Sequence, residues 1–210
     1  NWMESFGVPR NARVLNVGAG SGVFSQMARA ASYVVADVEP DPSAIAVNQW
    51  DPESIELIRM GIMDLDPTDI QVDVVVMHDV LEHIEDDRAA AHRVWEILGG
   101  GSRPGLFIAS VPAWPALFGL HDEMLGHHRR YTPRAFTSLI NDRFQILTSR
   151  QFGLLGIPAA LLYSRLLRRP YPVGSGSASE RIFAVGCRFE EQVRSPVGSS
   201  LLIACSPMPR

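Results

Sequence analysis

A glycine-spaced turn directly after a short apolar run is the feature that most constrains the fold of this chain. Residues 13–17 predict a buried strand, and Gly18, Gly20 and Gly22 follow at alternate positions before an apolar helical segment begins. Glycine permits positive φ angles and lets a ligand approach the main chain closely. Because a helix that opens after such a turn presents free N–H groups, the stretch predicts a site for a nucleotide-like cofactor.

Strand-like and helix-like segments alternate along the rest of the chain. We expect strands at residues 13–17, 32–37, 55–62, 72–77, 105–111, 144–148 and 201–205. We expect helices at 23–31, 44–48, 87–98 and 152–167, and another that opens at Thr132. In the first helix, Phe24, Met27 and Ala28 are predicted to face the sheet. This alternation predicts an α/β fold with a Rossmann-like, doubly wound, mostly parallel sheet and helices on both faces, in a single domain over residues 1–210.

Several function classes are disfavoured by the composition. All 19 residues of the Lys+Arg total are arginine, so a lysine Schiff base, a glycine–lysine phosphate loop and a tyrosine–lysine dehydrogenase pair are excluded. The net charge of −4 argues against nucleic acid as a partner. Val23 stands where a dinucleotide-binding fingerprint has its third glycine, which weakens a nicotinamide-dependent function.

The cellular compartment is suggested by two features. Only Cys187 and Cys205 are present, too few for a disulfide framework, which suits a reducing compartment. The first residues, from Asn1 onward, contain no apolar segment of the signal-peptide kind. We therefore expect a cytoplasmic protein. A start at Asn rather than Met suggests that residues are missing before Asn1.

Four segments together resemble the class I S-adenosylmethionine-dependent methyltransferases. They are Val14–Ser25, Val34–Pro40, Asp64-Leu65 and Asp73–Ile84, in the family's order and at suitable spacings. The resemblance covers roughly residues 10–150 and is strongest to the type 11/12 group that includes ubiquinone- and menaquinone-pathway methyltransferases. It implies a seven-stranded sheet with an antiparallel last strand. It also implies S-adenosyl-L-methionine as methyl donor and S-adenosyl-L-homocysteine as product.

The resemblance also implies a set of cofactor-binding residues, namely Asn16, Gly18, Ala19, Gly20, Asp37, Val38, Asp64, Leu65 and His78. The glycine turn would line the methionine and ribose parts, and Asp37 would accept hydrogen bonds from the ribose diol, with Glu39 as its local rival. Asp64 would bond the adenine amino group between the apolar neighbours Val38 and Leu65. His78 would lie along the methionine moiety. Asn16 replaces an acid that helps to position the cofactor's ammonium group.

The segment 113–131 is predicted to form an active-site loop over the methyl-donor end, because it follows the fifth strand. His121, Asp122 and His127 are the candidate catalytic residues, since they could polarise an acceptor hydroxyl or remove its proton. Arg129 and Arg130 could hold an anion or pin the loop. No tight spacing of metal ligands is present, so no metal is expected. His83 could equally be a structural helix-start residue and is left out of the catalytic set.

Residues 152–180 are predicted to form an apolar helix and a mobile loop that act as a cap or insertion. The apolar part has about 16 residues, short of the ~20 needed to span a bilayer. A cap on the substrate pocket or an oligomer contact is the preferred interpretation. The alternative is peripheral membrane contact through 152–169, where arginines follow the apolar run.

The favoured function is O-methylation of a small molecule, sugar or lipid-like precursor. No Asn-Pro-Pro-Tyr motif of amino-methylating enzymes is present, which disfavours a DNA or protein-amide acceptor. Two alternatives remain open, a nicotinamide-dependent Rossmann oxidoreductase and an inactive cofactor-binding module of methyltransferase fold. The sequence leaves the acceptor and the oligomeric state undetermined.

Overall fold

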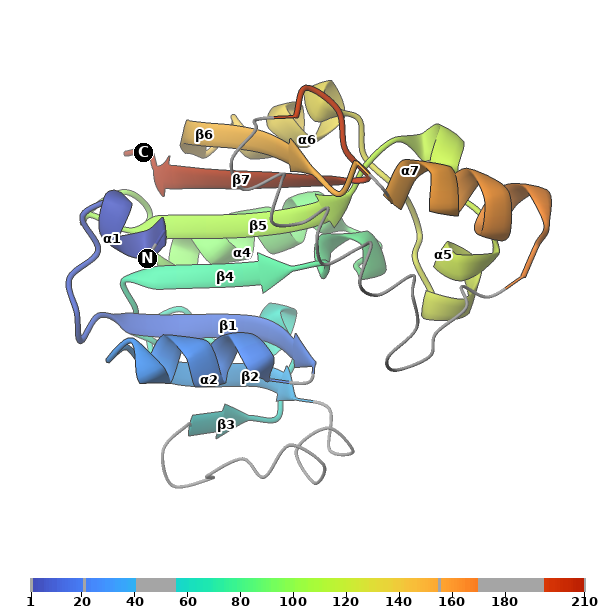
Figure 1. The fold of residues 1–210 in the computed structure, drawn as a ribbon. Helices are drawn as coiled ribbons and strands as arrows, with labels where there is room; N and C mark the ends of the chain where they lie inside the picture. Colours follow the sequence, from blue (N-terminus) through green and yellow to red (C-terminus); the bar gives the residue numbers. More distant parts are fainter. Residues whose placement is uncertain (1, 21, 41–55, 155, 170–194, 210) are drawn as a thin grey trace.

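One mixed sheet organises the computed structural model, which describes residues 2–20, 22–40, 56–154, 156–169 and 195–209. Within these residues its strands are β1 (Arg13–Gly20), β2 (Val34–Pro40), β3 (Glu56–Ile58), β4 (Val74–His78), β5 (Leu106–Pro112), β6 (Phe144–Phe152) and β7 (Ser200–Pro207). Their order is β3-β2-β1-β4-β5-β7-β6 (Figure 1). β1 to β5 pair in parallel, whereas β7 is antiparallel to both β5 and β6. The predicted doubly wound sheet with an antiparallel last strand is confirmed.

Helices cover both faces of the sheet. The α-helices among the described residues are α1 (Trp2–Ser5), α2 (Val23–Ala30), α4 (Asp87–Ile97), α5 (Leu120–Leu125), α6 (Pro133–Ile140) and α7 (Gly156–Ala159). Three 3-10 turns, η1 (Ile62–Asp64), η2 (Leu81–His83) and η3 (Pro115–Leu117), and a π-helical segment, η4 (Ala160–Leu166), complete the description. In Figure 1, α2 lies in front of the sheet, α4 and α6 lie behind it, and α5 and α7 lie beyond the carboxyl ends of the parallel strands.

Two hydrophobic cores lie on opposite faces of the sheet. Side chains alternate along β4, so that Val75 and Met77 join one core while Val74 and Val76 join the other. The first core packs the sheet against α4 and α6, and the second packs it against α1 and α2. A central strand buried on both faces explains the continuous apolar run at residues 74–77.

The expected orientation of α2 is wrong at one residue. Met27 is 68% exposed, while Ser25 and Ala28 are buried and Phe24 is half-buried. Ser25 and Ala28 lie three positions apart on one face of the helix, and this face meets the sheet. The polar Ser25 faces inward because its hydroxyl is hydrogen-bonded to a strand residue, a contact that hydrophobic periodicity does not reveal.

Three further segments differ from the expectations. The strand expected at 55–62 is only three residues long, and after Gly61 the chain turns into η1. The expected loop at 113–131 contains η3 and the helix α5. Phe152 ends β6, where it pairs with Ser200, so the expected apolar helix begins only at Gly156 and is π-helical from Ala160 onward.

Two expected elements fall outside the described residues. These are the short helix at 44–48 and the mobile loop from residue 170 onward. Within the described part of the chain, no helix combines the length and apolar character required to traverse a bilayer.

Candidate functional site

The glycine turn at the end of β1 favours glycine for two reasons, its positive φ angles and the close approach of a neighbouring side chain. Gly18, Gly20 and Gly22 all have positive φ angles, and Gly22 precedes α2 in the left-handed conformation. A Cβ at Gly18 would lie 2.5 Å from Cγ2 of Val80, which follows β4. Val80 therefore packs directly against the turn. Since the first turn of α2 has N–H groups without intrahelical partners, the predicted cofactor turn has the expected local geometry.

Gly18→Ala is expected to lower the free energy of unfolding by roughly 1–3 kcal/mol, from left-handed strain and overpacking. Both costs arise at one atom, the added Cβ against Val80 at a φ of 65°. Denaturant unfolding measures the loss. The double variant Gly18→Ala/Val80→Ala relieves the collision but not the strain, so relative to Val80→Ala alone it should lose only the strain part of the stability. Gly18→Ala with wild-type stability would contradict this account.

Asp37 lies at the centre of a buried polar cluster between β1, β2 and α2. It pairs in register with Asn16, and its side chain is fully buried. Its Oδ1 accepts hydrogen bonds from Asn16 Nδ2 at 2.9 Å and from Ser25 Oγ at 2.5 Å. Its Oδ2 is buried without a hydrogen-bond partner among the described residues. Burial raises the pKa of Asp37, although the bonds from Ser25 and Asn16 partly oppose this.

Asn16 uses its amide to hold Asp37 and Ser25. The structure thus brings together two residues of the predicted cofactor set that are 21 positions apart. The free acceptor capacity of Asp37 Oδ2 fits a ligand hydroxyl, which would donate to it. The side chain of the rival, Glu39, lies outside the described residues.

The other predicted cofactor residues occupy the same edge of the sheet. Val38 and Leu65 are buried in one core cluster, and Asp64 is exposed at the end of η1. His78 ends β4 half-buried, with Nδ1 3.3 Å from Ser110 Oγ and its ring edge-on to Phe24 at 5.4 Å. Burial lowers the pKa of His78, which favours a neutral ring at pH 7.

Asp122 organises the segment that follows β5. It is fully buried, and its Oδ2 accepts from the Gly119 N–H at 3.0 Å. Its Oδ1 lies 2.9 Å from His127 Nδ1 and accepts from Arg130 Nε at 2.7 Å. Burial alone would raise the pKa of Asp122, but the bonds from His127 and Arg130 outweigh it and lower the pKa to about 2. Two of the three candidate catalytic residues, Asp122 and His127, are therefore in contact, and Asp122 can orient the His127 ring.

His121, the third candidate, lies in the first turn of α5. It is half-buried, and its backbone N–H donates to Ser164 Oγ of η4 at 3.0 Å. Burial lowers the pKa of His121, so its imidazole is suited to accept a proton at pH 7. Arg129 and Arg130 are engaged within the protein, with Asp87 at 3.0 Å and Asp122 respectively. These ion pairs agree with the second of the two predicted roles of these arginines, which was to hold the loop in place.

Glu82 is the residue at this edge that sequence reasoning missed. It is fully buried in η2, and neither carboxylate oxygen accepts a hydrogen bond from another described residue. Burial raises the pKa of Glu82 to about 8, and the nearby carboxylates of Asp79 and Asp122 also raise it. Its Oε1 lies 4.0 Å from His127 Nε2. The sequence pointed to this region only through the adjacent residues Glu82 and His83. No local pattern indicated that His127 lies next to Glu82.

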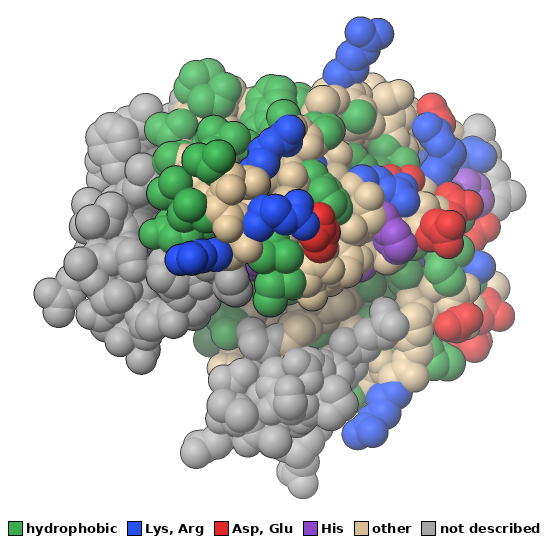
Figure 2. Space-filling view, turned by 90° about the vertical axis from the view of Figure 1, so that its right-hand side faces the viewer, with side chains coloured by type: hydrophobic (Ala, Val, Ile, Leu, Met, Phe, Trp, Pro, Cys, Tyr) green, Lys and Arg blue, Asp and Glu red, His purple; other side chains and the backbone are tan. Residues whose placement is uncertain are grey.

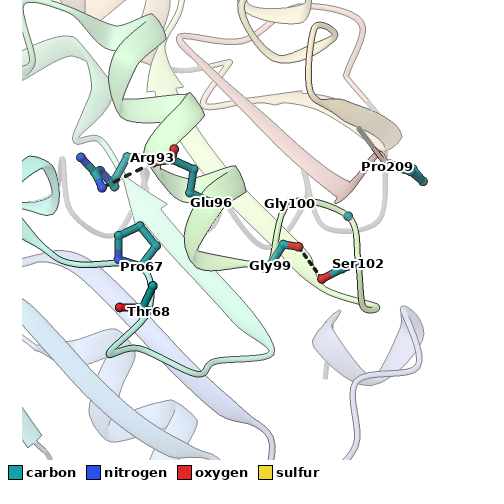
Figure 3. Close-up of a pocket in the computed structure, with 9 residues that line it drawn as sticks. Pro67, Thr68, Arg93, Glu96, Gly99, Gly100, Ser102 and Pro209 are labelled. Carbon is teal, nitrogen blue, oxygen red and sulfur yellow. Dashed lines mark hydrogen bonds and ion pairs between the residues drawn. The ribbon is translucent and has the colours of Figure 1, made fainter.

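A separate cavity lies at the opposite end of the sheet. It has a volume of about 630 Å³, and its lining includes Pro67, Thr68, Gly99, Ser102 and Pro209 (Figure 3). These residues come from loops that precede β4 and β5 and from the end of β7. Ligands of doubly wound sheets bind at the carboxyl ends of the strands, so this cavity is not the candidate site.

Comparison with known proteins gives one family match and a consistent fold. A family model described as "Methyltransferase domain" matches residues 15–103. An uncharacterized methyltransferase of Mycobacterium leprae (strain TN) is 29% identical over 130 residues, which cover 60% of this chain and 47% of the relative. One from Mycolicibacterium gilvum is 31% identical over 144 residues, covering 63% and 55%. The chain spans about half the length of these curated relatives.

Solved structures share the fold. The N-methyltransferase NodS from Bradyrhizobium japonicum WM9, in complex with S-adenosyl-L-homocysteine, matches with a TM-score of 0.58 at 15% identity, covering 98% of this chain and 83% of that one. The 1,6-didemethyltoxoflavin-N1-methyltransferase of Burkholderia thailandensis matches with a TM-score of 0.59 at 17% identity, covering 98% and 74%. At such identities the likeness concerns the fold.

Proposed function

We propose that the protein is an S-adenosylmethionine-dependent methyltransferase, and the match of residues 15–103 to a methyltransferase domain model supports this proposal. The observation that carries the proposal is that the glycine turn and Asp37 lie at the same edge of the sheet, where Asp37 Oδ2 is buried and has no hydrogen-bond partner among the described residues. A ribose hydroxyl could donate to this oxygen while the turn's backbone approaches the methionine part. We retain the full predicted set of cofactor residues, from Asn16 to His78.

S-adenosylmethionine supplies an already activated methyl group. This chain's residues would hold the donor, orient the acceptor in line with the sulfonium, and exclude water. We propose an oxygen acceptor, because buried acidic and histidine side chains gather where the acceptor would enter. An acceptor hydroxyl must lose a proton as its oxygen bonds to the methyl carbon.

We assign the role of base to His121, and we assign to Asp122 the orientation of His127, whose Nδ1 lies 2.9 Å from its carboxylate. His121→Ala is expected to lower kcat by about 10²–10⁴-fold, the usual contribution of general base catalysis, with S-adenosylhomocysteine affinity kept. His128→Ala is the matched control, since the His128 side chain is exposed and the substitution keeps its backbone N–H, which donates to Glu82. Steady-state kinetics and calorimetric binding test both variants. Full activity of His121→Ala would return this histidine to a structural role.

The acceptor is proposed to be a small molecule or a lipid-like precursor. Exposed leucines of η4, Leu161, Leu162 and Leu166, lie in a segment that also carries Arg165 and Arg168. Figure 2 views this side of the molecule and shows apolar and positively charged side chains close together. A cap of this composition suits an apolar acceptor with an anionic group. The same face could contact a membrane surface peripherally.

Labelled S-adenosylmethionine incubated with fractionated cell extract tests the activity and the acceptor class together. Label in an organic-soluble product supports the lipid-like acceptor, and label in a water-soluble one supports the small molecule. Binding of S-adenosylhomocysteine without binding of NAD(H) is the expected calorimetric result. Saturable binding of NAD(H) alone would overturn the proposed function.

A further inference from the structure

We propose that Glu82, His83 and His127 bind one divalent transition-metal ion beside the methyl-donor site. The ligand-capable atoms of these three side chains all lie within 4.8 Å of one another. Metal–ligand bonds of about 2.0–2.2 Å allow ligand atoms to lie at most about 4.4 Å apart, so small side-chain rotations that draw these atoms closer would let a single ion contact all three. The role of this ion in catalysis rests on the proposed methyl transfer, but its binding does not.

Glu82 supplies the strongest reason to expect a cation. Its carboxylate is fully buried, and neither oxygen accepts a hydrogen bond from another described residue. A buried carboxylate that accepts no hydrogen bond from another residue is costly, and natural proteins rarely leave one unexplained. The carboxylates of Asp79 and Asp122 place negative charge close to Glu82, which Arg130 only partly offsets. A metal ion would satisfy both oxygens and the local charge together.

The two histidines are oriented as metal ligands usually are. His127 Nδ1 lies 2.9 Å from the Asp122 carboxylate, so a proton on Nδ1 leaves Nε2 free toward Glu82. A carboxylate that holds the far nitrogen of a ligating histidine is the common second layer of metal sites. His83 has its own hydrogen bond to the Gly126 backbone, and its ring meets that of His127 edge-on at 4.6 Å.

Backbone contacts hold the two halves of the site in place. The His128 N–H donates to the Glu82 carbonyl at 2.8 Å, and the Tyr131 hydroxyl donates to the Leu81 carbonyl at 3.2 Å. These bonds fix the segment after β4 against the segment after α5. Val80, two residues before Glu82, packs on Gly18 of the cofactor turn. The proposed metal site therefore adjoins the predicted position of the donor.

The ligand set indicates the class of metal and its use. Two imidazoles and one carboxylate favour Mn²⁺, Fe²⁺, Co²⁺, Ni²⁺ or Zn²⁺ over Mg²⁺ and Ca²⁺, which prefer oxygen alone. Three protein ligands leave positions open for an acceptor hydroxyl, whose pKa the ion would lower. The hydroxyl proton passes to His121, the oxygen lone pair forms the bond to the methyl carbon, and the electrons of the broken S–C bond return to sulfur.

Cobalt binding tests the site without reference to activity. The full chain, free of a polyhistidine tag and stripped with a chelator, is titrated with Co²⁺. We expect saturable binding of one ion with visible d–d absorption, displaced by Zn²⁺. Glu82→Gln should weaken Co²⁺ binding at least about 10–100-fold, since loss of even a second-layer partner costs that much. His83→Ala should weaken it comparably, and His128→Ala, the control, should bind as wild type does.

Thermal unfolding of each variant shows that it is folded, and the nearly isosteric Glu82→Gln is chosen to keep the packing. Absence of saturable Co²⁺ binding by the wild-type chain overturns the inference, as does equal binding by folded Glu82→Gln. S-adenosylhomocysteine affinity is measured on the same samples. If the wild-type chain binds Co²⁺ but not S-adenosylhomocysteine, the proposed function alone is overturned. If it binds S-adenosylhomocysteine but not Co²⁺, the metal site alone is overturned.

Discussion

Asp122→Asn is expected to lower the free energy of unfolding by about 3–5 kcal/mol, the cost of leaving a buried charge without its partner. Asp122 is fully buried, and the Arg130 side chain beside it is 6% exposed. Asparagine keeps an oxygen for the Gly119 N–H but removes the negative charge that faces the guanidinium. The other hydrogen-bond partner of Arg130 among the described residues, the Ala113 carbonyl at 3.3 Å, carries no net charge. Denaturant unfolding with an unchanged m-value measures the loss.

The neighbouring acid provides the matched control for this variant. Glu123 pairs with Arg168 at 3.2 Å, but both side chains are largely exposed, at 46% and 64%. Glu123→Gln should therefore change the stability by less than about 1 kcal/mol. If Asp122→Asn and Glu123→Gln lost similar amounts, the buried ion pair would not hold this segment together.

Acid titration provides a second test of the same carboxylate. The pKa of Asp122 is lowered from 3.8 to about 2, so the folded state binds the proton less readily than the unfolded state does. Its stabilisation is therefore complete above the unfolded pKa and is lost as the pH falls toward 2. In Asp122→Asn this part of the acid dependence should disappear, whereas Glu123→Gln should keep it.

Asp37→Asn is expected to weaken S-adenosylhomocysteine binding by about 10–150-fold, equivalent to the 1.5–3 kcal/mol of a hydrogen bond to a charged group. The amide oxygen can still accept from Asn16 and Ser25, as Oδ1 does now. The amide nitrogen would then occupy the place of Oδ2 and present a donor to the ribose hydroxyls. Isothermal titration calorimetry measures the change.

This loss of affinity should not arise from unfolding. Burial raises the pKa of Asp37 and so disfavours its charged form, which means that a neutral amide avoids a desolvation cost. Asp69→Asn, at an exposed acid away from the site, is the control. An unchanged dissociation constant for Asp37→Asn would mean that the ribose site is misplaced. Glu39→Gln would then be the next variant to measure.

Local patterns in the sequence were sufficient for the sheet and for the cofactor turn. The apolar run at residues 74–77, the caps Asp86 and Thr132 before α4 and α6, and the glycines after β1 act through neighbours in the chain. Such short-range signals depend on backbone propensity and side-chain period, so they can be recognised without a structure. In α2 the hydrogen bond of Ser25 to Asp37 turns this polar residue toward the sheet, and the prediction that Met27 faces the sheet was wrong.

Contacts between distant segments were decided only by the tertiary structure. Nothing local indicates that Asn16 donates to Asp37, or that Glu82 lies against His127 and Asp122. The burial of Glu82, and hence its raised pKa, depends on how the segments after β4 and α5 pack together. The glycine turn and Asp37 thus follow from sequence, because strand and turn geometry is local. The cluster of Glu82, His83 and His127 follows from the fold, because desolvation is a property of the packed surroundings.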